Sequence, residues 1–175
     1  MDKSSTLSNQ RLRVVVANGL IMALYVAVTV LVAPVASGAI QFRVSEGLNH
    51  LVVFNRKLMW GVFGGVVLYN LFFGMGILDV VFGGGQTLLA LSATALLQKK
   101  VPNVFVRLAL NTIFFSLSMF LIAIMLHLTL ALPFWATFGT TALSELIIMT
   151  ITAPPPPPPP HPASPTLPPP PPTTP

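Results

Sequence analysis

The sequence predicts an all-α membrane protein, a bundle of six transmembrane helices with both termini in the cytoplasm. Three observations lead to this fold class. Of the 175 residues, 54% are hydrophobic and only 7% are charged, whereas a soluble domain carries about 25% charged residues. Long apolar stretches contain no charged side chain. The basic residues lie mostly between these stretches, as they do in the cytoplasmic loops of membrane proteins.

The first predicted helix covers residues 12–33, after a cytoplasmic N-terminus of residues 1–11. No residue between Arg13 and Arg43 is charged, and this stretch exceeds the ~20 residues that a transmembrane helix needs. Pro34 ends the helix because proline lacks a backbone donor. A cleaved signal peptide is the alternative. We favour a retained helix, because a signal core is shorter, about 7–15 residues, and more apolar segments follow at once.

The next three predicted helices cover residues 42–55, 58–73 and 77–98. The first of these is short, because fourteen residues of α-helix rise only about 21 Å. The hydrocarbon core is about 30 Å thick. Either this helix begins below the outer membrane surface, or the preceding loop dips into the membrane. Gly74 and Gly76 mark the turn between the other two helices.

The fifth predicted helix follows Pro102 and continues to about Leu128, and the sixth covers residues 134–153. Pro133 separates the two, because a proline cannot continue a helix without breaking its hydrogen-bond ladder. Six helices are therefore the count that the apolar stretches and their breaks predict.

A polyproline tail follows the last predicted helix, at residues 154–175, and holds most of the chain's 18 prolines. Such a segment cannot form an α-helix, and polyproline II in water is its physical expectation. We therefore place the membrane domain at residues 12–153 and expect the tail to be disordered or artefactual.

The distribution of basic residues predicts the orientation. If the N-terminus is cytoplasmic, the inner loops contain two basic pairs, Arg56–Lys57 and Lys99–Lys100. The outer loops contain no lysine or arginine apart from Arg43. Basic residues concentrate in cytoplasmic loops, so both termini are predicted inside. The net charge of +5 is spread in ones and twos, which argues against a nucleic-acid partner.

Ionisable side chains within the spans are candidates for function, because each is costly in hydrocarbon. Arg43 and Glu46 are three residues apart, so on a helix they share a face and can pair. Such a pair would stabilise the start of the helix, and it does not exclude that one of the two residues also lines a binding pocket. Asp79 falls in the first turn of the fourth helix, where a carboxylate can cap the helix or contact a ligand. Glu145 has no basic residue nearby in sequence, so its partner comes from another helix or from a ligand.

Motifs for catalysis and metal binding are missing from the sequence. There is no Gly-x-Ser-x-Gly or His-Glu-x-x-His pattern. The glycines at 83–85 lack the Lys-Ser/Thr of a phosphate loop, and His127 has no second ligand three or four residues away. We therefore expect no enzyme, no resident metal or cofactor and no ATPase site. A protein that binds a small polar solute and works with partners is favoured.

Small residues recur every four positions on two predicted helices. Gly19, Ala23 and Ala27 form a stripe on the first helix, and Gly61 and Gly65 form another on the third. Small side chains let helices approach one another closely. Packing within the chain accounts for such stripes, and the stripe on the first helix also suits a partner membrane subunit.

One stretch is more specific than the rest, residues 37–48 with the sequence SGAIQFRVSEGL. It resembles the signature of the queuosine-precursor transporter family (QueT), whose members are substrate-binding S components of energy-coupling factor (ECF) transporters. The resemblance continues through residues 54–57 and 76–83 and, more weakly, through residues 143–145. Gly47 stands where the family usually has alanine.

The resemblance implies a six-helix subunit of the bacterial cell membrane that captures a small heterocyclic micronutrient, a queuosine precursor of the 7-deazaguanine type. It also implies a transmembrane coupling subunit and two cytoplasmic ATPases as partners. ATP is then used by the partners, and this chain needs no cofactor. In such subunits a small-residue motif on the first helix contacts the coupling subunit, which assigns that role to Gly19, Ala23 and Ala27.

A 7-deazaguanine precursor has hydrogen-bond donors on its purine-like edge and an aminomethyl cation, and both suit carboxylates. The predicted substrate-binding residues are Gln41, Arg43, Glu46, Asp79, Asn111, Trp135 and Glu145. The amides suit contacts with the heterocycle, and the indole suits stacking. One alternative is an S component for another vitamin or a pyrimidine-type solute, because a fold does not fix its ligand. From another class, the alternatives are a structural membrane subunit or an orphan intramembrane enzyme.

Overall fold

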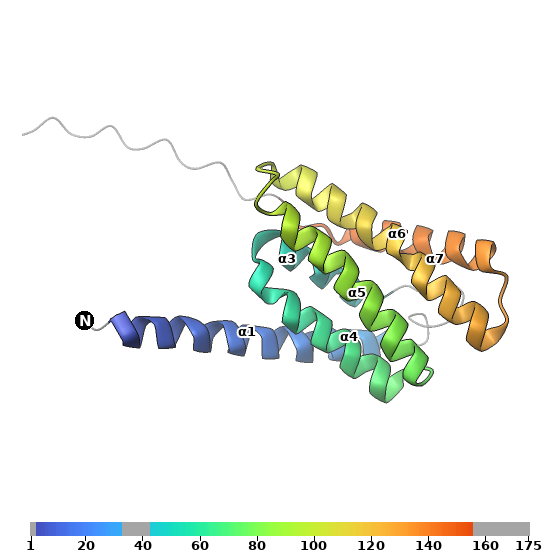
Figure 1. Cartoon of the computed structure of the whole chain (residues 1–175), viewed down its shortest axis with the longest axis horizontal. Coiled ribbons are helices and arrows are strands. Elements are labelled where there is room, and N and C mark those ends of the chain that lie inside the picture. Colours follow the sequence, from blue (N-terminus) through green and yellow to red (C-terminus); the bar gives the residue numbers. More distant parts are fainter. Residues whose placement is uncertain (1–2, 33–42, 156–175) are drawn as a thin grey trace, which may run out of the picture.

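The computed structural model describes residues 3–32 and 43–155, and the regular structure in these ranges is all helical (Figure 1). The predicted all-α fold is thus confirmed. Gln41 and the tail beyond residue 155 lie outside the described residues. With η marking a 3-10 helix, the elements are α1 (Lys3–Leu31), η1 (Val44–His50), α3 (Leu51–Phe54), η2 (Arg56–Leu58), α4 (Met59–Phe73), α5 (Ile77–Leu97), α6 (Val104–Leu130) and α7 (Phe134–Ile151).

Four of the described helices are long and apolar enough to cross a membrane: α1 from Ser8 onwards, α5, α6 and α7. Helix α4 has 15 residues and rises about 22 Å, which is short of the ~30 Å hydrocarbon core. Elements η1 and α3 have seven and four residues and together rise about 20 Å. The structure therefore gives four candidate spans by length and composition, and six crossings remain a prediction.

The prediction of one α-helix at residues 42–55 is wrong, because Val44–His50 forms a 3-10 helix. The chain forms the 3-10 helix η1 followed by the single α-helical turn α3. Ser45, Gly47 and Asn49 lower the α-helical propensity of this stretch. A 3-10 helix has three residues per turn, so side chains three apart are eclipsed. Ser45, Glu46, Asn49 and His50 are buried along η1.

The other predicted helices agree with the structure more closely. Helices α4, α5, α6 and α7 begin or end within two residues of the predicted bounds. The Asn103 side chain caps α6 by accepting from Phe105 N at 2.9 Å and Val106 N at 3.3 Å. Helix α1 begins at Lys3 rather than at residue 12, and no proline or glycine interrupts it before Gly19.

The long helices pack in chain order, α1 on α4, α4 on α5, α5 on α6 and α6 on α7 (Figure 1). Element η1 contacts α1, α4, α6 and α7, and α3 contacts α5 and α6. The short segment is therefore surrounded by the long helices. Non-α-helical backbone is tolerated at membrane depth only where protein or a water-filled cavity surrounds it. The structure meets that condition.

The glycine stripe of α4 packs α4 against α1. A Cβ atom on Gly61 would lie 2.7 Å from the Asn18 carbonyl oxygen, and one on Gly65 would lie 2.6 Å from Tyr25 Cβ. Both approaches are closer than real Cβ contacts. The Gly61 amide also donates to Asn18 Oδ1. Packing within the chain, one of the predicted roles of such stripes, is confirmed for these two glycines.

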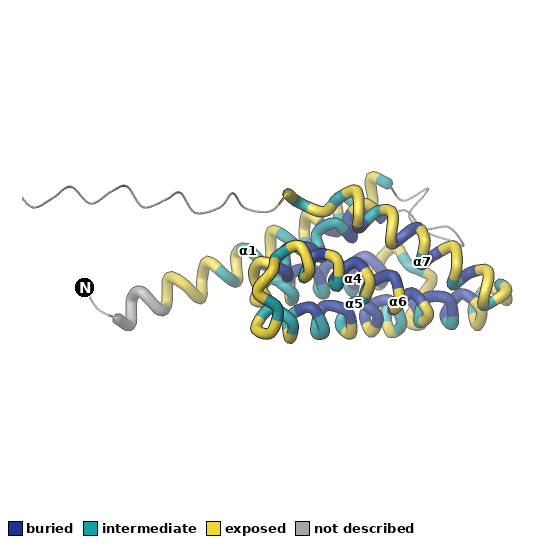
Figure 2. Tube along the Cα trace, turned by 90° about the horizontal axis from the view of Figure 1, so that it is seen from above, coloured by how far each residue is buried: buried dark blue, intermediate teal, exposed yellow. Residues whose placement is uncertain are grey.

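Many large apolar side chains lie on the outside of the bundle and many polar ones lie inside, the reverse of a soluble protein. Figure 2 shows buried residues along the inner faces of the helices and exposed ones along the outer faces. Large apolar side chains such as Leu20, Phe72 and Leu96 are exposed, whereas Glu46, Asp79 and other polar groups are buried. An apolar exterior suits a lipid environment, and ionisable groups within a membrane protein face the bundle interior.

Candidate functional site

A small polar cavity lies between η1, α5, α6 and α7. Its volume is about 10 Å³, enough for roughly one water molecule. Met119 and Ile122 of α6 form the apolar part of the lining. The polar part consists of Arg43, Glu46, Gln86, Thr141 and Glu145. Three of the predicted substrate-binding residues, Arg43, Glu46 and Glu145, are thus brought together from distant parts of the chain.

Glu46 is held in place by two hydrogen bonds. The Tyr25 hydroxyl on α1 donates to Glu46 Oε1 at 2.5 Å, and Asn49 Nδ2 donates to Oε2 at 2.5 Å. A second link joins α1 to η1, because the Thr29 hydroxyl lies 2.6 Å from Ser45 Oγ. Hydrogen bonds to a buried carboxylate are among the strong ones. They fix the Glu46 charge at the edge of the cavity.

Arg43 lies at the start of η1 and is buried. Its guanidinium carbon is 5.5 Å from the centre of the Tyr69 ring on α4, a cation–π distance. Arg43 also interacts electrostatically with Glu46 and Asp79. Both alternatives that the sequence leaves open have support, because Arg43 and Glu46 interact with each other and also line the cavity.

Glu145 differs from Glu46 in its hydrogen bonding. It is only 4% exposed, and among the described residues no group hydrogen-bonds its Oε1 atom. It interacts electrostatically with Glu46 and Arg43 across the cavity. A buried polar atom without a partner costs about 1–3 kcal/mol, and more when the group is charged. A ligand that donates to this oxygen would remove that cost.

Asp79 has a structural role at the start of α5. Its Oδ2 atom accepts from the Met75 amide at 3.1 Å, and its backbone carbonyl accepts from Asn70 Nδ2 at 3.0 Å. The Oδ1 atom is buried and has no hydrogen-bond partner among the described residues. Asp79 does not line the cavity. The Asp79 carboxylate therefore holds the turn before α5 and does not cap an N–H group of the helix, and a ligand contact stays a prediction.

Two other predicted residues lie away from the cavity. Asn111 is buried in a separate network, where Nδ2 lies 3.2 Å from His50 Nδ1 and Oδ1 accepts from Thr94 at 2.6 Å. Trp135 lies in the first turn of α7 with 78% of its surface exposed, and its ring packs edge-on against Phe134. Their contacts with a substrate, like that of Gln41, stay predictions.

Tyr25 and Gln86 are site residues that the sequence prediction omits. Tyr25 positions Glu46, as described above, and Gln86 Nε2 donates to Ser118 Oγ at 2.8 Å beside the cavity. The available signal was weak. Tyr25 is the one aromatic residue with a hydrogen-bonding group in the first apolar stretch, and Gln86 is an amide within an apolar helix.

The small-residue stripe of α1 lies on the outer surface. Gly19, Ala23 and Ala27 are exposed, and a Cβ atom on Gly19 would meet nothing within 4 Å. Tyr25 and Thr29, on the other side of α1, are buried against η1. Helix α1 therefore presents small side chains outwards, and its inner face contacts η1.

Comparison with known proteins agrees with this architecture. A model of a family described as QueT transporter matches residues 15–155. The chain belongs to the QueT transporter family. It is also 38% identical over 148 residues to the queuosine precursor transporter QueT of Lactococcus lactis subsp. cremoris (strain MG1363), covering 79% of this chain and 87% of that protein. No solved structure matches.

Membership of the QueT family, together with the long apolar helices, makes the chain a multi-pass membrane protein with a role in transport rather than catalysis. The resemblance seen in the sequence is thereby confirmed at the level of the family. The family match includes the polar cavity, its two glutamates and the exposed stripe of α1.

Proposed function

We propose that this QueT family member is the substrate-binding membrane subunit of an ECF-type importer and captures a queuosine precursor of the 7-deazaguanine type. The observation that carries the proposal is the polar cavity, in which Glu145 presents a buried oxygen without a hydrogen-bond partner among the described residues. The name of the L. lactis relative supports the class of solute.

The chemistry of the cavity suits that solute. A 7-deazaguanine donates hydrogen bonds from its ring N–H and exocyclic amine, and an aminomethyl substituent adds a cation. Glu145 and Glu46 supply carboxyl oxygens that accept from these donors, and hydrogen bonds from a cationic aminomethyl group are stronger than neutral ones. Arg43 can donate to the carbonyl oxygen of the ring. Met119 and Ile122 offer apolar contacts to the flat heterocycle.

The cavity must widen to hold such a solute, because its present volume of about 10 Å³ holds roughly one water. Helices α5, α6 and α7 line it together with η1, so separation of any of these elements enlarges it. Binding would therefore be accompanied by a rearrangement of the bundle, which a ligand can drive by its preference for the wider state.

Transport also requires an energy source. We propose that a transmembrane coupling subunit docks on Gly19, Ala23 and Ala27, where the exposed small residues permit close helix contact. Two cytoplasmic ATPases would then use ATP on behalf of this chain, which itself needs no cofactor. Six crossings of the bacterial cell membrane with both termini inside are part of the proposal. The start of α1 and the end of α7 lie at the same end of the bundle (Figure 1), which supports an even number of crossings.

Binding to the purified protein tests the proposal. We expect saturable binding of 7-aminomethyl-7-deazaguanine to the protein in lipid nanodiscs, measured by titration calorimetry. Glu145→Gln should weaken binding about 10- to 100-fold, because a hydrogen bond to a charged group contributes about 1.5–3 kcal/mol. Lys99→Gln removes an exposed charge that does not line the cavity and should leave the affinity unchanged.

Two results would contradict the proposal. Absence of binding by this and related 7-deazaguanines would exclude the solute class. An unchanged affinity in Glu145→Gln would show that the buried carboxylate does not contact the solute. Co-purification of a larger membrane protein and two ATPases with the tagged chain tests the assembly separately.

A further inference from the structure

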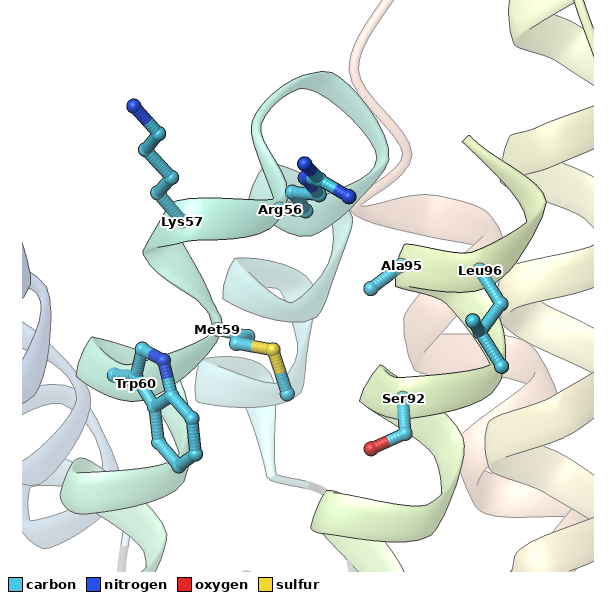
Figure 3. A pocket seen from close by; sticks show the side chains of 7 residues that line it. All are labelled: Arg56, Lys57, Met59, Trp60, Ser92, Ala95 and Leu96. Atoms are coloured by element: carbon cyan, nitrogen blue, oxygen red, sulfur yellow. The ribbon is translucent and has the colours of Figure 1, made fainter. Parts of the chain in front are cut away.

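A second hollow opens on the outer surface, between η2 with the start of α4 and the last turns of α5 (Figure 3). Its volume is about 430 Å³. It shares no lining residue with the polar cavity. Met59, Ala95 and Leu96 make its apolar part, and Arg56, Lys57, Trp60 and Ser92 bring hydrogen-bond donors to it. We refer to these seven residues as the surface groove.

The donors of the groove are not used by the rest of the protein. In Figure 3 the Arg56 side chain lies above the groove, the Trp60 ring stands on the α4 side, and the Ser92 hydroxyl points towards Met59. Within residues 3–32 and 43–155, no side-chain hydrogen bond is made by Arg56, Trp60 or Ser92. By contrast, the Thr150 hydroxyl donates back to its own helix, to Leu146 O at 2.6 Å.

The groove lies at the cationic end of the bundle. Lys99 and Lys100 are exposed in the turn after α5. This turn is tied to the end of α3, just before η2, because Gln98 Nε2 donates to Phe54 O at 2.7 Å. Immediately beside these charges the outer surface becomes apolar, with Leu96 71% exposed. The groove therefore spans a boundary between cationic and apolar surface.

Such a boundary matches the headgroup level of a membrane. Tryptophan is enriched there, and basic residues follow on the polar side. Trp60 is 59% exposed and lines the groove together with Arg56 and Lys57, whose side chains lie above its ring in Figure 3. A guanidinium group binds phosphate in a bidentate manner, and a lysine adds a compact positive charge.

We propose that the surface groove binds one anionic phospholipid, such as phosphatidylglycerol. The phosphodiester lies against Arg56 and Lys57, with Trp60 and Ser92 as further donors, and an acyl chain follows the apolar side along Leu96. Charge complementarity favours an anionic lipid over a zwitterionic one, because juxtamembrane basic residues each contribute to the attraction of anionic lipids. The proposal uses none of the cavity residues and is independent of the solute.

The two tryptophans of the chain allow a direct test. Trp135 lies in the first turn of α7, and α7 begins at the end of the bundle away from the groove (Figure 1). In a Trp135→Phe background, Trp60 is the only tryptophan, so the fluorescence reports on lipid close to this side chain. We compare its quenching by brominated phosphatidylglycerol and by brominated phosphatidylcholine at equal mole fraction in vesicles. We expect an apparent preference for the anionic lipid of about fivefold or more.

Matched charge variants separate a site from general attraction. Arg56→Gln with Lys57→Gln should bring the preference close to one, whereas Lys99→Gln with Lys100→Gln removes the same charge nearby and should retain most of it. These side chains are exposed, so the fold does not depend on them. Equal quenching by the two lipids in the Trp135→Phe protein, before any charge is changed, overturns the proposal. So does an equal loss of preference in both double variants, which would indicate diffuse attraction or a different occupant of the groove.

Discussion

The hydrogen bond from the Tyr25 hydroxyl to Glu46 Oε1 links α1 to the polar cavity, and Tyr25→Phe removes it without changing the ring. Tyr25 is fully buried, and the bond measures 2.5 Å. Removing a hydrogen bond to a buried charged group costs about 1.5–3 kcal/mol. Asn49 would be left as the one hydrogen-bond donor that the described residues offer to the Glu46 carboxylate. We therefore expect the free energy of unfolding to fall by that amount.

Tyr69→Phe is the matched control, because Tyr69 is the other tyrosine of the chain and is also buried. Its hydroxyl has no hydrogen bond to a described residue, and phenylalanine keeps the ring that faces Arg43. We expect this substitution to leave stability nearly unchanged, because it removes a buried hydroxyl that has no hydrogen bond to a described residue. Unfolding by sodium dodecyl sulfate in mixed micelles, followed by circular dichroism, gives both values. Equal losses in the two variants would refute the reasoning, because the hydrogen bond to Glu46 would then contribute nothing specific.

Two further predictions concern helix contacts. Ala27→Leu should prevent co-purification of the coupling subunit and leave the affinity for 7-aminomethyl-7-deazaguanine unchanged. The reason is that Ala27 is exposed on the outer face of α1 and does not line the cavity. Recovery of the whole complex with this variant would contradict the docking proposal. Gly65→Ala should destabilise the protein by about 1–3 kcal/mol through overpacking against Tyr25. Gly85→Ala, which meets nothing within 4 Å, should instead stabilise it by about 0.5–1 kcal/mol. The same detergent unfolding measures both glycine variants, and equal effects would show that α1 and α4 are not in close contact.

The long helices were predictable because their ends carry strong local signals. Gly74 follows the last residue of α4, Gly76 and Pro133 directly precede α5 and α7, and Asn103 caps α6 through its own side chain. The 3-10 form of Val44–His50 was not predictable in the same way. Three residues per turn and 3.6 residues per turn both place Glu46 and Asn49 near each other, so their spacing does not distinguish the two forms.

The cavity was predictable only in part, and for a physical reason. Arg43, Glu46 and Glu145 stood out because ionisable groups are rare in apolar spans. Which of the amides face the same cavity depends on helix rotation, and spans that are apolar on most sides carry little information about rotation. Asn111 therefore fell in a separate network with His50, whereas Gln86 reached the cavity.

The polar cavity lies beside η1, a 3-10 helix, and the membrane environment explains this placement. A continuous α-helix satisfies its own backbone in lipid, so it can stand anywhere in the bundle, but a short 3-10 helix needs protein around it. Once the long helices enclose η1, its polar side chains lie in the interior, where Tyr25 and Asn49 satisfy Glu46. The close contact of α1 with α4, which Gly61 and Gly65 permit, is part of that enclosure. The same packing that encloses η1 therefore creates the polar cavity. Under the proposed function, the solute would donate a hydrogen bond to the buried Glu145 Oε1 atom, which has no partner among the described residues.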